Sequence, residues 1–77
     1  MNLRNRLGFN VRRLRKERDL SQERLSVLSG LARAYVSSVE TGRRNATLDT
    51  LEILARTLGV DASELIARPT VADTDTR

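Results

Sequence analysis

The stretch SQERLSVLSGLARAYVSSVE, residues 21–40, decides how this 77-residue chain folds. Its apolar residues recur every three or four positions on each side of Gly30, as on one face of a helix: Leu25, Leu28, Leu31, Val36 and Val39. Gly30 can adopt the left-handed conformation that ends a helix and turns the chain. Ser21 suits an N-cap, and Glu23 suits the positive end of the following helix. The stretch predicts a helix-turn-helix.

The second helix of this pair, residues 32–40, has a solvent side made of Arg33, Ala34, Ser37 and Ser38, with Tyr35 at the edge. An arginine can donate two hydrogen bonds to a guanine edge, and small side chains let a helix lie deep in the major groove of DNA. We therefore predict that Arg33 reads a base, with a phosphate contact or a solvated side chain as the alternatives. Tyr35 can bind the sugar-phosphate backbone or brace the helices.

Around this pair, the chain from about residue 7 to residue 66 resembles the Cro/C1-type helix-turn-helix family of bacterial and phage DNA-binding regulators. The hydrophobic frame matches without gaps, as do Gln22, Gly30, Glu40 and Gly42. Within the family, RAYVS at residues 33–37 followed by RN at 44–45 is similar to the controller proteins of restriction–modification systems. The resemblance implies an all-α, compact five-helix bundle of the lambda-repressor-like DNA-binding type.

The resemblance also implies roles for residues around the recognition helix. Ala34, Ser37 and Ser38 occupy its other base-facing positions. Gln22 would bind a phosphate, with Ser21 beside it, and Glu40 would form an ion pair with Arg15 that orients the helix. Glu23 is placed to contact RNA polymerase, and the implied homodimer interface is formed by Leu58, Val60, Leu65 and Ile66.

The loop after the recognition helix contains Arg43, Arg44 and Asn45, where positive side chains and free N–H groups suit DNA phosphates. A solvated loop is the alternative. Residues 1–44 hold eleven Lys or Arg against four acids, whereas residues 45–77 hold three against six. This segregation is expected when one half of a protein faces a polyanion and the other faces a partner subunit or solvent.

The remaining chain predicts three more helices. The first covers residues 2–18, with Leu3 on its apolar stripe and Gly8 costing about 1 kcal/mol unless close packing needs it. The fourth covers residues 48–58 after the cap Thr47, with Leu48 on its buried face. The fifth runs from an Asp61 cap through Ala67. We expect one domain, residues 1–68, and a disordered tail, residues 69–77.

The residue inventory argues against an enzyme. There is no His or Cys, no Gly-rich phosphate loop and no carboxylate cluster, so we expect no catalytic residue, no metal and no cofactor. The chain has no apolar run long enough for a signal peptide or membrane span, so we expect a soluble intracellular protein without membrane contact. The resemblance implies a bacterial cytoplasmic, nucleoid-associated location.

We therefore predict a homodimeric transcription regulator that binds double-stranded DNA at a palindromic operator, acting as the activator and repressor of a restriction–modification system. A phage-type or chromosomal repressor, or an antitoxin, of the same fold is an alternative. A helical protein-interaction module is an alternative from another class.

Overall fold

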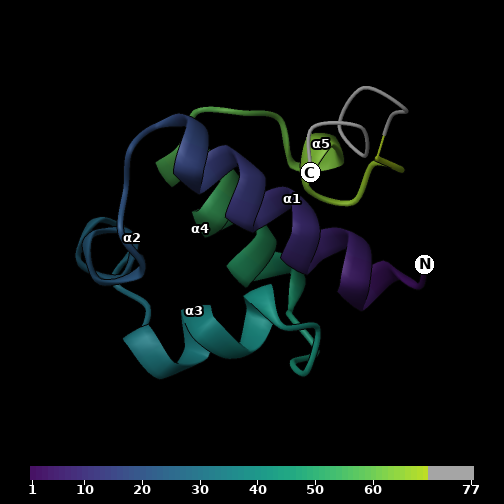
Figure 1. Cartoon of the computed structure of the whole chain (residues 1–77), viewed down its shortest axis with the longest axis horizontal. Helices are drawn as coiled ribbons and strands as arrows, with labels where there is room; N and C mark the ends of the chain where they lie inside the picture. The colour runs from purple at the N-terminus through teal and green to yellow at the C-terminus, as the bar shows by residue number, and fades with distance from the viewer. Residues whose placement is uncertain (70–77) are drawn as a thin grey trace.

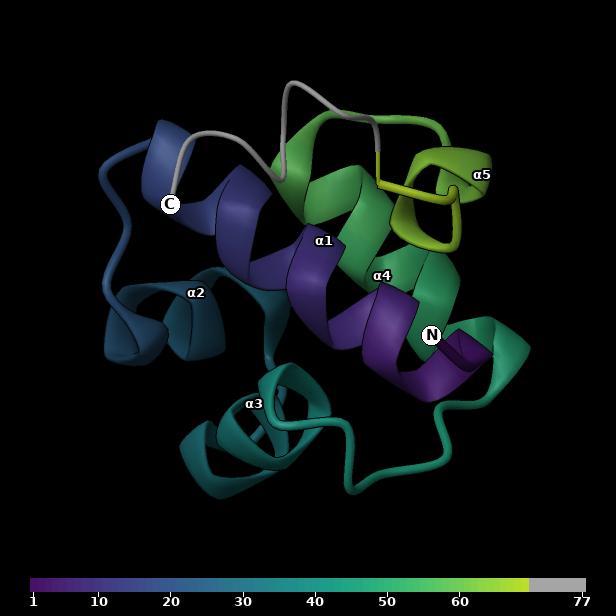
Figure 2. The same cartoon turned by 45° about the vertical axis from the view of Figure 1, so that its right-hand side comes forward.

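The computed structural model describes residues 1–69, which form a bundle of five helices (Figure 1). The helices are α1 (Leu3–Glu17), α2 (Gln22–Ser29), α3 (Arg33–Glu40), α4 (Leu48–Leu58) and α5 (Ala62–Leu65). α1 and α4 occupy the middle of the bundle, α2 and α3 lie at one side, and α5 lies on the opposite side (Figure 2). The predicted all-α five-helix fold is confirmed.

Most of these helices start at a residue whose side chain caps the helix N-terminus. Ser21 accepts a hydrogen bond from the Arg24 N–H at 2.9 Å, and Thr47 accepts one from the Thr50 N–H at 3.1 Å. Each cap satisfies one backbone donor that a helix start leaves unpaired. Gly30 ends α2 with a φ of +79°, in the left-handed region. The corner between α2 and α3 thus depends on local chemistry.

The fifth helix is shorter than predicted, because it ends at Leu65 and not at Ala67. The carbonyl oxygens of Leu65 and Ala67 accept hydrogen bonds from the Asn10 side chain. Pro69 also disfavours a helical conformation for the residue before it.

Within residues 1–69, ten buried apolar residues form the core, and all five helices contribute to it: Leu7, Val11, Leu14, Leu25, Val36, Val39, Leu54, Ala55, Leu58 and Leu65. Three leucines predicted to lie on buried faces are exposed. Leu3 and Leu48, in the first turns of α1 and α4, are 60% and 79% exposed, and Leu28 is 49% exposed. These predictions were wrong because helical periodicity identifies the apolar face of a helix but not how far along that face its neighbours reach.

No helix within residues 1–69 has the length and hydropathy needed to cross a membrane. The predicted disordered tail begins at Pro69, and its residues 70–77 lie outside the described part of the chain.

Candidate nucleic-acid interface

Helix α3 is anchored by one face and leaves the other open. Val36 and Val39 are buried, with 1% and 2% of their surface exposed. Arg33 and Ala34, at the start of the helix, are exposed, while Ser37 is half-buried. The N-cap residue Ala32 makes no side-chain capping bond. The first backbone N–H groups of α3 therefore have no side-chain cap and remain suited to an external acceptor.

Beneath α3, an ion pair and an amide join three helices. The Arg15 guanidinium donates from Nε to Glu40 Oε2 at 2.6 Å and from Nη2 to Glu40 Oε1 at 3.1 Å. Arg15 Nη1 also donates to the Leu20 carbonyl at 2.7 Å, and Gln22 Nε2 donates to Glu40 Oε1 at 3.0 Å. The acid at the end of α3 is thus neutralised inside the protein and fixes α3 to α1 and α2.

The backbone of α3 approaches α1 very closely at Gly8. A Cβ atom added to Gly8 would lie 2.6 Å from the Val39 carbonyl oxygen and 2.7 Å from that of Glu40. Such distances leave no room for a side chain. Only glycine lets α1 approach the backbone of α3 this closely. Contact with α1 therefore sets the depth at which the C-terminal end of α3 sits.

A small polar cluster lies on the outer side of α3, where the following loop folds back. The Arg44 guanidinium carbon lies 5.0 Å from the centre of the Tyr35 ring, within range of a cation–π interaction. Arg44 Nε donates to Ser38 Oγ at 3.4 Å, and Ser38 Oγ donates to the Tyr35 carbonyl at 2.8 Å. Three residues predicted to contact DNA are thus brought together. Ser38 is half-buried, so it is less accessible than Arg33.

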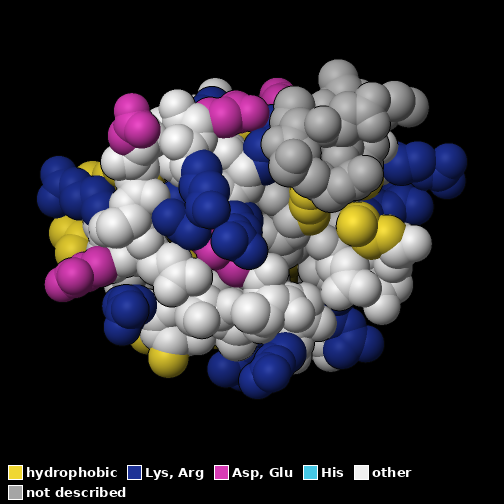
Figure 3. Space-filling model, viewed as in Figure 1, with side chains coloured by type: hydrophobic (Ala, Val, Ile, Leu, Met, Phe, Trp, Pro, Cys, Tyr) yellow, Lys and Arg dark blue, Asp and Glu magenta, His cyan; other side chains and the backbone are white. Residues whose placement is uncertain are grey.

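Positive charge surrounds the open face of α3. Arg33, Arg43 and Arg44 are exposed at its start and in the loop that follows, and Asn45 is exposed beside them. In the space-filling view, Lys and Arg side chains gather along the lower edge of the molecule, where α3 lies (Figure 3). This surface favours a polyanion over a neutral partner.

The predicted dimer residues divide into two groups. Leu58 and Leu65 are 2% and 0% exposed, because both pack in the core of their own protomer. They are not available to a second subunit, and their assignment to the interface was wrong. Val60 is half-buried and packs against the core, whereas Ile66 is 38% exposed.

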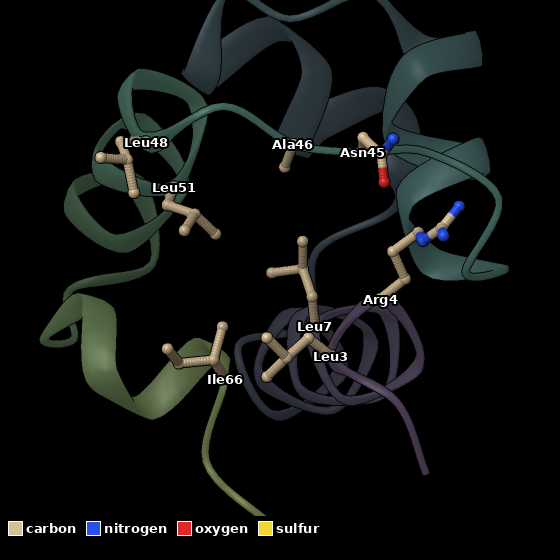
Figure 4. A pocket seen from close by; sticks show the side chains of 8 residues that line it. All are labelled: Leu3, Arg4, Leu7, Asn45, Ala46, Leu48, Leu51 and Ile66. Atoms are coloured by element: carbon tan, nitrogen blue, oxygen red, sulfur yellow. The ribbon is translucent and has the colours of Figure 1, made fainter.

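Ile66 belongs to an apolar groove that the sequence analysis did not identify. The groove has a volume of about 400 Å³ and is lined by Leu3, Arg4, Leu7, Asn45, Ala46, Leu48, Leu51 and Ile66. Leu3, Leu7 and Ile66 project from one side of the space, and Ala46, Leu48 and Leu51 face them (Figure 4). Two of these residues, Leu3 and Leu48, directly follow the N-caps of α1 and α4. Their place in the first turn of a helix could have indicated from sequence that these two residues are exposed, because a first turn often protrudes from the core.

Comparison with known proteins agrees with this geometry. A family model described as helix-turn-helix matches residues 11–65. The chain is 46% identical over 68 residues to the control protein C.SmaI of Serratia marcescens, covering 88% of this chain and 81% of that protein.

Two solved structures show the same fold. One is the restriction–modification controller protein C.AhdI from Aeromonas hydrophila, at a TM-score of 0.78 and 44% identity, covering 80% of this chain and 94% of that one. The other is the controller protein C.Esp1396I, solved as a tetramer with its natural 35 base-pair operator, at a TM-score of 0.73 and 28% identity over 99% of this chain and 90% of that one. The chain therefore belongs to the Cro/C1-type helix-turn-helix family of transcription regulators, which is a family of DNA-binding proteins and not of enzymes.

Proposed function

We propose that this protein binds a palindromic operator as a homodimer, with α3 of each subunit in the major groove, and serves as the controller of a restriction–modification system. The observation that carries the proposal is the arrangement of α3. Its inner face is fixed by Val36, Val39 and the Arg15–Glu40 pair, while its outer face begins with the exposed Arg33. A helix held rigidly and open on one side suits readout of base edges.

The base-reading residues in this proposal are Arg33 first, followed by Ala34, Ser37 and Ser38. Arg33 donates to guanine O6 and N7, whereas Ala34 can only contact a thymine methyl or leave room for the DNA. Ser38 is held by Tyr35 and Arg44, so its contribution is the smallest of the four.

The phosphate contacts come from both sides of α3. Gln22 uses one amide hydrogen on Glu40 and keeps the other for a phosphate, with Ser21 next to it at the start of α2. On the far side, Arg43, Arg44 and Asn45 lie in the loop, and the Tyr35 ring lies under the Arg44 guanidinium, so its hydroxyl would serve as a further phosphate donor. These contacts position the protein without specifying sequence.

The apolar groove supplies the dimer interface of this proposal. Leu3, Leu48 and Ile66 expose apolar surface on one side of the protomer. When such a patch is buried against the same patch of a second protomer, the contact is isologous, and its twofold symmetry matches that of a palindrome. The proposed interface thus lies at the first turns of α1 and α4 and at the end of α5, and of the residues predicted from sequence only Ile66 lines it.

As a controller, the protein would act at the bacterial nucleoid on its own promoter and on that of a restriction endonuclease. Its exposed Glu23 in the first turn of α2 would contact RNA polymerase. Glu23→Lys should then bind operator DNA with normal affinity yet fail to activate transcription in a reconstituted assay. Equal loss of binding and activation would make Glu23 a fold or DNA-binding residue.

Selection of binding sites from random duplex DNA tests the proposal as a whole. We expect an enriched palindrome with two half-sites about one helical turn apart. Affinity should fall steeply with salt, because bound phosphates release counterions. Absence of enrichment at several salt concentrations would exclude sequence-specific binding and favour a protein-interaction module.

A further inference from the structure

Asn10 is an amide buried in the middle of α1. It is 1% exposed, and its Nδ2 donates two hydrogen bonds, to the carbonyl oxygens of Leu65 and Ala67, both at 2.9 Å. Asparagine is a weak helix former, and a buried amide is tolerated only when it is hydrogen-bonded. Here both amide hydrogens are used on one short segment more than fifty residues away in the sequence.

Between the two acceptors lies Ile66. Its neighbours on both sides are tied to α1 through their carbonyl groups, while its own side chain lines the apolar groove (Figure 4). Helix α5 alone offers little support, because it has four residues and its last bond, from the Ile66 N–H to the Ser63 carbonyl, is 3.3 Å long. The position of Ile66 is therefore set by Asn10 more than by α5.

We propose that Asn10 is a positioning residue for dimerisation. This proposal rests on the homodimer that we propose at the groove. By holding the carbonyls of Leu65 and Ala67, Asn10 keeps Ile66 as a rigid wall of the groove before the second subunit arrives. A side chain that is already ordered loses less conformational entropy on binding, so preorganisation raises affinity. Asn10 makes none of the contacts across the interface in this proposal.

The test uses the two isoleucines of the chain, Ile53 and Ile66, as methyl NMR probes. Ile66 lines the groove and Ile53 does not. In a dilution series of the full chain, the Ile66 methyl signal should shift with concentration while the Ile53 signal stays nearly fixed. Sedimentation equilibrium on the same samples gives the dimer dissociation constant.

Asn10→Leu keeps the approximate shape of the side chain and removes both donors. We expect this variant to shift the Ile66 signal of the monomer and to raise the dissociation constant about tenfold through lost preorganisation. The matched control is Val36→Ala, a buried site on α3 that does not line the groove. It should destabilise the protomer in denaturant yet leave the dissociation constant of the folded protein unchanged.

The outcomes separate the two proposals. A wild-type Ile66 signal that never moves with concentration, from a protein that sediments as a monomer, would overturn the homodimer at the groove. If the wild type dimerises and Asn10→Leu dimerises with the same dissociation constant, the homodimer is supported but the role of Asn10 is overturned. If Asn10→Leu does not fold, Asn10→Ser is measured in the same way, because its hydroxyl cannot reach both carbonyls.

Discussion

The Arg15 guanidinium meets the Glu40 carboxylate through two hydrogen bonds, of 2.6 and 3.1 Å, in a site where the two side chains are only 10% and 3% exposed. The pair joins the C-terminal half of α1 to the end of α3. It thereby removes the only acid of α3 from the surface proposed to face DNA.

Removal of one partner of this pair should be strongly destabilising. Arg15→Met leaves the Glu40 carboxylate buried without its counter-ion, and we expect the free energy of unfolding to fall by about 3–5 kcal/mol. In urea denaturation, the double variant Arg15→Met/Glu40→Leu should lose less than the sum of the two single variants.

The same helix offers a matched control for the ion pair. Arg13 Nη1 lies 3.1 Å from Glu17 Oε2 on the surface of α1, where the Glu17 side chain is 53% exposed. Glu17→Gln should therefore change stability by less than about 1 kcal/mol. Comparable losses for Glu17→Gln and Glu40→Gln would contradict a special role for the buried pair.

Gly8→Ala should be destabilising although alanine favours helices. The added methyl would meet the Val39 and Glu40 carbonyl oxygens, so α1 and α3 must separate, at a cost of about 1–3 kcal/mol. Thermal denaturation measures the loss, and operator affinity should also fall because α3 shifts. Arg12→Ala, at an exposed position of the same helix, is the control and should be nearly neutral.

Arg33 and Arg43 should affect DNA binding in different ways. Arg33→Ala should cost about 1–3 kcal/mol of binding free energy on the selected operator and relax specificity at one base pair. Arg43→Ala should weaken all sequences alike and reduce the slope of log K against log salt by about one. Fluorescence anisotropy over several salt concentrations separates these effects. Full affinity and specificity in Arg33→Ala would remove Arg33 from base reading.

Leu48→Asp should break the proposed dimer without unfolding the protomer. Leu48 is 79% exposed in the groove, so a charge there is harmless to the monomer but would be buried against the second subunit. We expect the dissociation constant measured by sedimentation to rise by about a hundredfold. Val27→Asp, at a residue 65% exposed on α2, is the control. Equal effects of the two variants would place the interface elsewhere.

Protonation of Asp61 should loosen the start of α5. The side-chain hydroxyl and the backbone N–H of Ser63 donate to this carboxylate at 2.5 and 2.9 Å, and both lower its pKa below the ordinary 3.8. Because the folded pKa is the lower one, the cap stabilises α5 above the unfolded pKa and is lost as pH falls through the folded value. NMR titration of the Ser63 amide should therefore show a transition below pH 3.8. Asp61→Asn should abolish it, and a midpoint above 3.8 would contradict the assignment.

Local chemistry made the helices and the corner predictable. Thr47 as the cap and Leu48–Leu58 as the fourth helix were predicted with the bounds that the structure has, because a capping side chain and a repeat of three or four act within a few residues. Gly30 likewise ends α2 with a positive φ. The residues of the surface proposed to face DNA were predicted from sequence, since they follow from their position on one short helix and its loop.

Only the tertiary structure decided which apolar residues are covered. The sequence assigned Leu58 and Leu65 to a dimer interface and Leu48 to the core, whereas the structure buries the first two in the core of one protomer and leaves Leu48 79% exposed. The sequence by itself determined the helices, most of their ends and the exposed side of α3, because these depend on neighbours along the chain; the end of the fifth helix, at Leu65 and not at Ala67, is the exception. The groove and the Asn10 bonds to the segment around Ile66 were decided by the fold, because they depend on helices that meet only after α1, α4 and α5 have packed together.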